Sequence, residues 1–454
     1  MKTRFINLGI GLLALGVSSA WAQEYKVYDI GTYRLPDITR NELDFSLHSE
    51  GSFNDYTGTD GVGSFLGGDF EVSFNRYRNA RSFRGTHNAA VSFSGDYNKT
   101  IFGEKRGDYS LGLFYSNSSR FYGDDYEGLF FETGGAASFS MAGDKIFGAV
   151  EEEERNTFKK VTLSIPLRVG KGRIERVEDA RQAIYILENL SKRKVLNRKL
   201  TDEEIDEFAR LISTVKNKRF FDARLRMIDE VTAVDSFLVR SGALTSGGAS
   251  YFTTLYDYWM YGDLFKRKSG TEISGGVRPG FVYDASDSPD PSFHRNRLKE
   301  ASILADISFD YEKPLSLYWQ NSASAYLSGC YSRRDEQIKD HLYNELEYKR
   351  DDYAARLGGR YAFGYYPNSR TNINLGIEEV LGWDKSKWDD PAAEPQSYVS
   401  TNTSLTLDLY YYFSPQLRLA AEGRLIHCYK GDGVIDHYTR WQGNFVLTLT
   451  YSLF

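Results

Sequence analysis

The last stretch of the chain, Trp441–Leu453 (WQGNFVLTLTYSL), alternates between apolar and polar side chains. Its odd positions include Phe445 and Leu449, whereas its even positions carry mainly Asn, Thr and Ser. Because successive side chains of a β-strand point to opposite faces, this period of two predicts a strand with one apolar and one polar face. The same period recurs in 303–311, 353–363, 398–413 and 416–430.

Alternation also describes a soluble sheet with one solvated face, so the connections between strands must decide between the two folds. Glu312–Ser316, Tyr366–Arg370 and Ser414–Gln416 are tight and contain proline. Aromatic residues recur near strand ends, where a membrane barrel crosses the interfacial zones of the bilayer. Short turns at one end and long loops at the other are typical of transmembrane β-barrels. The longer links are 284–297, 333–342, 383–396 and 431–437.

The composition excludes three classes of protein. The mean hydropathy is −0.48, and no mature stretch approaches the roughly 18 consecutive apolar residues of a membrane-spanning helix. Two cysteines in 454 residues cannot hold together a disulfide-built fold. The net charge of −6 differs from the basic surface of a nucleic-acid binder, so we expect no nucleic-acid partner. The 33 Tyr, 29 Phe and 41 Gly favour many strands and turns.

Residues 1–22 have the features of a secretory signal peptide. A positively charged start precedes a short apolar stretch, and Ala20-Trp21-Ala22 supplies small residues before cleavage at Gln23. An uncleaved N-terminal anchor helix is the alternative. We therefore expect export, with 23–40 as an N-terminal periplasmic segment.

The alternating segments predict an all-β dominated fold, a closed antiparallel transmembrane β-barrel of about 14 strands. Closure is required because hydrocarbon offers no hydrogen-bond partner to an unpaired strand edge. The connections around 79–85 and 117–126 are expected to be longer than tight turns. Strands one to six fall within 41–170 and strands seven to fourteen within 270–454. The strands are expected at 42–54, 65–78, 86–99, 107–116, 127–141, 157–169, 271–283, 298–312, 315–332, 343–363, 370–382, 397–413, 416–430 and 438–454.

The chain resembles the porin-like β-barrel proteins of Gram-negative outer membranes, because its alternating last strand ends in an aromatic residue, Phe454. In that class the terminal Phe usually shares a face with the apolar residues before it, whereas here it lies in register with Ser452 and Thr450. The resemblance implies an outer-membrane location, contact with outer-membrane lipid and recognition by barrel-assembly machinery.

Residues 171–242 interrupt the strand pattern with helical spacing. An apolar stripe with steps of three and four residues runs from Ile174 to Leu190. Thr201-Asp202-Glu203-Glu204 is a capping box that begins a second helix, and a third helix starts near 220 and ends near Gly242. Since the segment follows the sixth strand, strand parity places this three-helix module in the periplasm. It is a structural cap on the barrel mouth or a docking module in which 173–240 binds a periplasmic protein; an extracellular position is the third alternative.

Two further segments have more than one interpretation. The aromatic segment 249–265 predicts a short helix or a strand, and it makes 243–269 a possible plug or mouth segment of the barrel. The acidic run Glu151–Glu154 lies in an expected outer loop, where a solvated loop is favoured over a site for divalent cations.

Charged residues on the polar strand faces are the candidates for lining the lumen. Charges of both signs in a lumen need either water or each other, because an unpaired desolvated charge is costly. They therefore form either a ladder of salt bridges that rigidifies the interior or a water-filled passage whose charges select solutes. The candidates are Asp306, Asp310, Asp352, Arg356, Arg360, Glu378, Asp408, Arg418, Glu422 and Arg424.

No catalytic, metal or cofactor site is expected. The six histidines are scattered, and Asp436 and His437 would point to opposite faces of a strand. No Gly-x-Ser-x-Gly, His-Glu-x-x-His or phosphate-binding glycine loop is present in the sequence. Cys330 and Cys428 lie four strands apart, too far for a disulfide.

These patterns predict an outer-membrane channel or transporter for small solutes, with selectivity from the lumen charges and no enzymatic activity. The alternative is a structural or assembly component of the cell envelope, whose helical insert binds a periplasmic partner. The two functions differ in whether solutes cross the barrel.

Overall fold

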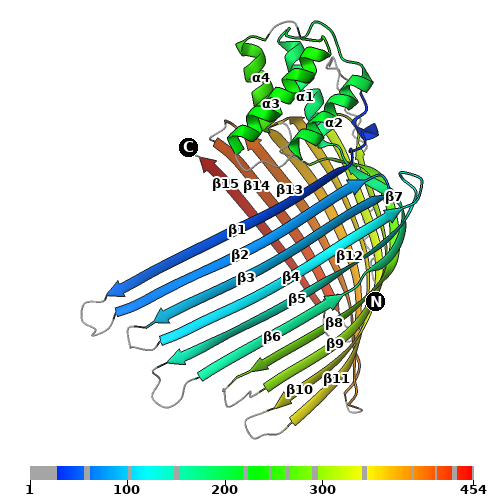
Figure 1. Ribbon diagram of the computed structural model, residues 1–454. Coiled ribbons are helices and arrows are strands. Elements are labelled where there is room, and N and C mark those ends of the chain that lie inside the picture. The colour runs from blue at the N-terminus through cyan, green and yellow to red at the C-terminus, as the bar shows by residue number, and fades with distance from the viewer. Residues whose placement is uncertain are drawn as a thin grey trace.

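One antiparallel sheet of fifteen strands forms a barrel-shaped wall, with a group of helices at one end (Figure 1). The computed structural model describes residues 28–55, 62–100, 105–147, 154–217, 223–244, 247–261, 266–288, 295–339, 345–390, 393–414, 417–431 and 437–451. The strands are β1 (Ile38–Asp55), β2 (Val62–Ala80), β3 (Phe83–Lys99), β4 (Lys105–Tyr122), β5 (Leu129–Phe147), β6 (Glu154–Ser164), β7 (Leu167–Arg176), β8 (Lys268–Asp287), β9 (Arg295–Pro314), β10 (Trp319–Lys339), β11 (Glu345–Asn368), β12 (Thr371–Trp388), β13 (Gln396–Tyr412), β14 (Leu417–Gly431) and β15 (His437–Tyr451).

The fifteen strands occupy fourteen positions in the wall. β6 and β7 follow one another in the same position, because both pair with β5 on one side and with β8 on the other. The interruption falls at Ile165-Pro166, where proline cannot donate a ladder hydrogen bond. The predicted antiparallel barrel with a helical insertion is confirmed, and the expected strand at 157–169 is corrected to two strands.

The apolar residues of the alternating strands form a belt on the outside of the wall. Leu407 and Leu447 are 47% and 59% exposed, and Leu419 shares their face through its cross-strand partner Leu449. The intervening positions, such as Ser308 on β9, line the inner side of the sheet. A continuous apolar face of this kind marks a surface that contacts lipid or protein, and together with the polar inner face it corresponds to the outward belt of a transmembrane barrel.

Short and long connections lie at opposite ends of the wall, as predicted. β9–β10, β11–β12 and β13–β14 are joined by short turns at the same end as the helices. The β2–β3 connection is also only two residues long, Arg81 and Ser82, which corrects the longer turn expected around 79–85. The β4–β5 link, 123–128, is longer. In bacterial outer-membrane barrels the short turns are the ones that face the periplasm.

The helices form a module between β7 and β8. They are α1 (Glu178–Lys192), α2 (Asp202–Lys216), α3 (Ala223–Arg240) and α4 (Ala249–Tyr261). The predicted capping box is present: Glu204 N donates to Thr201 Oγ1 at 3.3 Å, and Thr201 N donates to Glu204 Oε2 at 2.9 Å. The bond from Arg198, followed by that from the Thr201 backbone, lowers the pKa of Glu204 to about 2.

Three boundaries of the predicted insert change. Ile174 belongs to β7, where it pairs with Gly270, because the ladder with β8 continues to Arg176. The segment 249–261 is a fourth helix rather than a strand, and its Leu255 and Trp259 join the core of the module. β1 and β8 also begin slightly before the predicted limits of 41 and 270.

The buried apolar core of the structure lies in the helical module and not in the wall. Ile184, Leu187 and Phe208 are almost completely buried there, and Phe208 stacks on Phe237 with ring centroids 5.0 Å apart. The short helix η1 (Ile30–Thr32) and the residues after it pack into the same core. Tyr33 Oη and Ser213 Oγ are hydrogen-bonded at 2.7 Å, which joins the N-terminal segment to α2.

The first and last strands are the two margins of the sheet. The ladders run without interruption from β1 to β15, and none joins β15 back to β1 among the described residues. Both strands are exposed along most of their length, on the outward face and on the inward face. The signal peptide, Glu151–Glu153, Asp436 and Phe454 lie outside the described residues. No described helix is long and apolar enough to cross a membrane.

We expect β1 and β15 to pair in a lipid bilayer, because each unsatisfied backbone group in hydrocarbon costs several kcal/mol. The two strands run in opposite directions, so a regular antiparallel ladder can form. Cys330 and Cys428 are first replaced by Ser. In this background, Ser46→Cys should form a disulfide with a second cysteine on β15, which is placed in turn at each inward position from Gln442 to Thr450. Non-reducing electrophoresis of protein in lipid measures the cross-link.

The matched control is Ser46→Cys combined with Ser308→Cys, which places the second cysteine on the inner face of β9. This pair should remain reduced. Absence of a cross-link at every scanned position of β15 would contradict closure of the wall.

Candidate functional site

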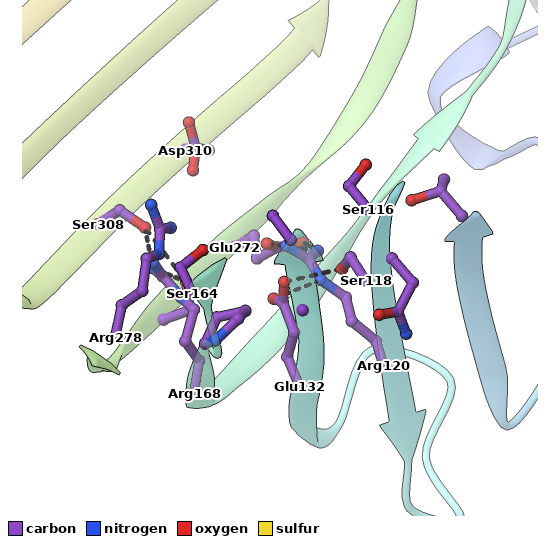
Figure 2. Close-up of a pocket in the computed structure, with 16 residues that line it drawn as sticks. Ser116, Ser118, Arg120, Glu132, Ser164, Arg168, Glu272, Arg278, Ser308 and Asp310 are labelled. Atoms are coloured by element: carbon purple, nitrogen blue, oxygen red, sulfur yellow. Dashed lines mark hydrogen bonds and ion pairs between the residues drawn. The ribbon is translucent and has the colours of Figure 1, made fainter. Parts of the chain in front are cut away.

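A polar cavity of about 430 Å³ lies on the inner side of the wall, toward the end that carries the helices. Its lining residues come from the strands β3 to β9, and Figure 2 shows side chains converging from neighbouring strands. Arg120 is two residues from the end of β4, and Asp310 is four residues from the end of β9. The cavity therefore lies in the short-turn third of the wall.

The most buried part of the cavity is a row of one arginine between two glutamates (Figure 2). Arg120 contacts the Glu132 carboxylate at 2.8 Å and the Glu272 carboxylate at 2.7 Å. Ser118 Oγ donates a further hydrogen bond to Glu132 at 2.8 Å. These three charged side chains are less than one fifth exposed, so their interaction is strengthened by the low dielectric around them.

A second ion pair lies beside this row. Arg168 contacts the Asp306 carboxylate at 2.5 Å, and its Nη2 atom donates to Ser274 Oγ and Ser308 Oγ, both at 2.9 Å. The sequence predicted Asp306 on the inner face, and in the structure its ion-pair partner is Arg168 of β7. Arg168 thus connects three consecutive strands across the inner surface.

Arg278 and Asp310 line the same cavity without an ion-pair partner in the described part of the chain. Asp310 is the direct cross-strand neighbour of Glu272 in the β8–β9 ladder. Like charges directly opposite each other in a sheet repel, so the Asp310 carboxylate favours water or a hydrogen-bond donor. These two side chains are the charged groups of the cavity that a solute can reach.

The break between β6 and β7 positions the cavity. Pro166 lines it, and Ile165 N donates at 3.1 Å to the Pro279 carbonyl oxygen across the break. Gly276 of β8 is required by the close approach of β7, since a Cβ there would lie 2.2 Å from the Leu167 carbonyl oxygen. An interruption of this kind bends a strand and redirects its side chains.

Only two of the ten predicted lumen residues, Asp306 and Asp310, belong to this cavity region. The structure places the others on the strands β11 to β14. Arg356 contacts Asp384 at 2.5 Å, and Asp352 contacts Arg350 at 2.9 Å. The remaining six occur as cross-strand neighbours or as single exposed side chains: Arg360 lies opposite Glu378, Asp408 lies opposite Glu422, and Arg418 and Arg424 are exposed on β14.

The sequence interpretation missed five charged residues of the cavity region. The period-two alternation could have identified two of them, because Glu272 and Arg278 alternate with the exposed Ile273, Val277 and Phe281. Arg120 was missed because the predicted fourth strand ended at 116, six residues before β4 ends. The other two residues are Glu132 and Arg168.

Buried arginines fix the helical module to the wall at the same end. Arg267 donates to the carbonyl oxygens of Ser316, Leu317 and Trp319 at 2.8, 2.5 and 2.7 Å. Burial, and then the nearby Arg181, lowers the pKa of Arg267 to about 10, which leaves the side chain cationic at neutral pH.

Two contacts reach the β11–β12 turn from α1 and α4. Tyr185 Oη donates to the Tyr366 carbonyl oxygen at 3.1 Å, and burial raises the pKa of Tyr185 to about 12. Arg370 contacts Asp257 at 2.9 Å. The module is therefore docked on the short turns through hydrogen bonds from several helices.

The described residues contain no group of three or more His, Cys, Asp or Glu side chains arranged to hold a metal ion. Cys330 and Cys428 are both free thiols. The inner surface is dominated by hydroxyls and by carboxylate–guanidinium pairs, which can exchange hydrogen bonds with a hydrated solute.

Replacing Arg267 should loosen the module without unfolding the wall. Arg267→Ala leaves three turn carbonyls without their donor, and a loss of about 2 kcal/mol in docking free energy corresponds to roughly thirtyfold more of the undocked state. Trypsin cleavage within 178–261 should accelerate accordingly, as measured by electrophoresis and mass spectrometry. Arg240→Ala is the control, because Arg240 is an exposed residue whose Nε atom donates to the carbonyl of Ser236 in the preceding turn. Equal cleavage rates in the two variants would contradict the docking role.

The chain matches no protein-family model and no curated protein sequence. Among solved structures it is similar to the autotransporter NalP translocator domain from Neisseria meningitidis, at 10% identity and a TM-score of 0.28, covering 77% of this chain and 86% of that one. It is also similar to the ferric yersiniabactin uptake receptor FyuA from Yersinia pestis, at 7% identity and a TM-score of 0.38, covering 88% and 62%. The Pseudomonas putida toluene transporter TodX gives 9% identity and a TM-score of 0.25, covering 92% and 88%.

With TM-scores this low, the assignment depends on the architecture of the chain itself. The wall has fourteen antiparallel positions, an apolar belt outside, polar side chains inside and short turns at one end. The chain has the fold of an outer-membrane β-barrel, with a helical module docked at its short-turn end.

Proposed function

We propose that the protein is a channel or transporter for small polar solutes across the outer membrane. The observation that carries the proposal is the polar cavity of about 430 Å³ on the inner side of a wall whose outer side is apolar. A hydroxyl-rich surface with reachable charges replaces part of the hydration shell of a passing solute, as the linings of selective channels do. The proposal includes no catalytic step and no bound cofactor.

The inner charges favour cations over anions. The ten lumen candidates comprise six carboxylates and four arginines, and the cavity region adds two glutamates and three arginines, which leaves an excess of one carboxylate. Asp408 and Glu422 are exposed and lie directly opposite each other on the inward faces of β13 and β14, with Arg418 and Arg424 on the same face of β14. Two carboxylates in this position raise the local concentration of cations within a Debye length, which is about 8 Å at physiological ionic strength.

Single-channel recording in planar bilayers tests this function. The protein should produce discrete conductance steps with a preference for potassium over chloride. Asp408→Asn should lower that permeability ratio by about twofold, because it removes one carboxylate from the lumen field. Glu394→Gln is the matched control, since Glu394 is exposed in the β12–β13 connection and its charge should have little effect. Bilayers that stay sealed with correctly folded protein would contradict the channel function.

A second candidate function is docking of a periplasmic protein on the helical module. It is favoured by exposed apolar residues on two helices, Ile228 and Val239 on α3 and Phe252 and Tyr256 on α4. Phe252 is 56% exposed and lies one helical turn from Tyr256, so the two rings share a face. Outer-membrane lipid and the barrel-assembly machinery are further expected partners, through the apolar belt and the last strand.

Site-specific photo-cross-linking in cell envelopes separates the two functions. A photo-cross-linking probe placed on α4 should form an adduct with a periplasmic protein. The double variant Phe252→Ala with Tyr256→Ala should lose this adduct, while the single-channel conductance stays unchanged. Thr253→Ala is the control on the same helix, because its exposed side chain bonds only within α4. An adduct retained by the double variant would argue against partner docking through this face.

A further inference from the structure

A second cavity, of about 380 Å³, lies between the helical module and the ends of β1 and β2. From the wall it is lined by Arg40 and Tyr77, which are cross-strand neighbours. The outward positions of these strands are the odd ones of β1, such as Phe45, and the even ones of β2, such as Phe70. Arg40 and Tyr77 therefore lie on the inward face, and the cavity is at the junction of the inner wall and the module.

Three carboxylates that line the cavity already have cationic partners within it. Arg176 contacts Glu178 at 2.6 Å, and Lys216 contacts Asp179 at 3.4 Å.

The third carboxylate belongs to Glu230. It contacts Arg226 at 2.6 Å and accepts a hydrogen bond from Trp259 Nε1 at 2.9 Å. The negative charge of the lining is therefore neutralised by the lining itself.

Two more cations line the same cavity, Arg40 and Lys266. Arg40 also pairs with Glu42, which lies further along β1 and is not part of the cavity. Lys266 is exposed and makes no ion pair with the described residues. Five cationic and three anionic side chains line the cavity, so its potential is positive and Lys266 is available to a ligand.

Apolar side chains also line the cavity. Trp259 is 5% exposed, and it is accompanied by Leu35, Met227 and Met260. Lys216 Nζ lies 5.6 Å from the centroid of the Trp259 ring. A lining that combines these apolar side chains with an excess of cationic groups matches a small molecule that has one hydrocarbon part and one anionic group.

We infer that this junction cavity binds an amphiphilic organic anion, such as an alkyl phosphate or carboxylate. Its anionic group contacts Lys266 and Arg40, and its hydrocarbon part packs on Trp259 and Met227. The site is separate from the polar cavity of the proposed channel, and binding here does not depend on solute passage.

Isothermal titration calorimetry of the full-length protein in lipid nanodiscs tests the inference, with hexyl phosphate as the probe. Hexyl phosphate should bind saturably at one site. Its affinity should fall as the salt concentration rises, because the contacting cations are partly exposed. Inorganic phosphate alone, hexanol and hexylamine should each bind at least tenfold more weakly, since each lacks one of the two required features or has the wrong charge.

Variants identify the residues. Lys266→Gln combined with Arg40→Gln should weaken hexyl phosphate binding roughly tenfold, with an unchanged thermal unfolding midpoint because both side chains are exposed. Lys313→Gln is the control, because Lys313 is an exposed lysine on the outward face of β9 and does not line the cavity. Met227→Gln provides an independent test of the apolar lining and should also weaken binding.

Two results would overturn the inference. One is equal binding of hexanol and hexyl phosphate, which would mean partition into apolar surface or lipid alone. The other is an affinity in the Lys266 and Arg40 double variant equal to that of the Lys313 control. Conductance through the barrel is recorded in parallel, and it should be the same with and without hexyl phosphate, so that failure of this site and failure of the channel are distinguished.

Discussion

The structure depends on the need to pair every backbone N–H and C=O group in an environment without water. An isolated strand in hydrocarbon leaves these groups unsatisfied, at a cost of several kcal/mol each. The ladders from β1 to β15 answer this requirement everywhere except at the two margins of the sheet, and they do so with almost no conventional core, since the outer face is apolar and exposed and the inner face is polar. The buried apolar core is confined to the helical module, where α1 is surrounded by other helices and by the short turns.

The interior is organised by charge pairing across neighbouring strands. The arginines Arg120, Arg168 and Arg356 each contact a carboxylate on another strand, so the pairs reinforce the backbone ladders that they span. Asp310, Asp408 and Arg278 differ, because they lie on the same face without such a partner among the described side chains. The inner surface thus combines a set of paired charges with a smaller set of charges that have no ion-pair partner among the described residues.

The helical module is attached to the wall by polar contacts at its base. Arg267 and Tyr185 donate to carbonyl oxygens at the short-turn end. Within the wall, Arg173 of β7 likewise donates to the carbonyl oxygens of Ala80 and Arg81 at the β2–β3 turn. Turn carbonyls are otherwise left without partners at the end of a barrel. Buried guanidinium groups satisfy several of them at once, which fixes the module in place and leaves two cavities beside it, one on the wall and one at the junction.

The sequence alone determined the faces of the strands and their approximate number, about fourteen where the structure has fifteen in fourteen positions. A period of two is a local property, so Leu407 and Leu447 could be placed on the outer belt, and the capping box at Thr201 could be placed at a helix start, without knowledge of any distant contact. The tertiary structure decided which charges meet. Arg120 and Glu272 are far apart in the chain, and their contact depends on the break at Pro166 and on the pairing of β7 with β5 and β8. Ile174 likewise joined a strand rather than a helix, because its neighbour Gly270 becomes adjacent only when the insert folds back. Local periodicity fixes the direction in which a side chain points, whereas its partner is fixed by the register of strands that the sequence brings together over long distances.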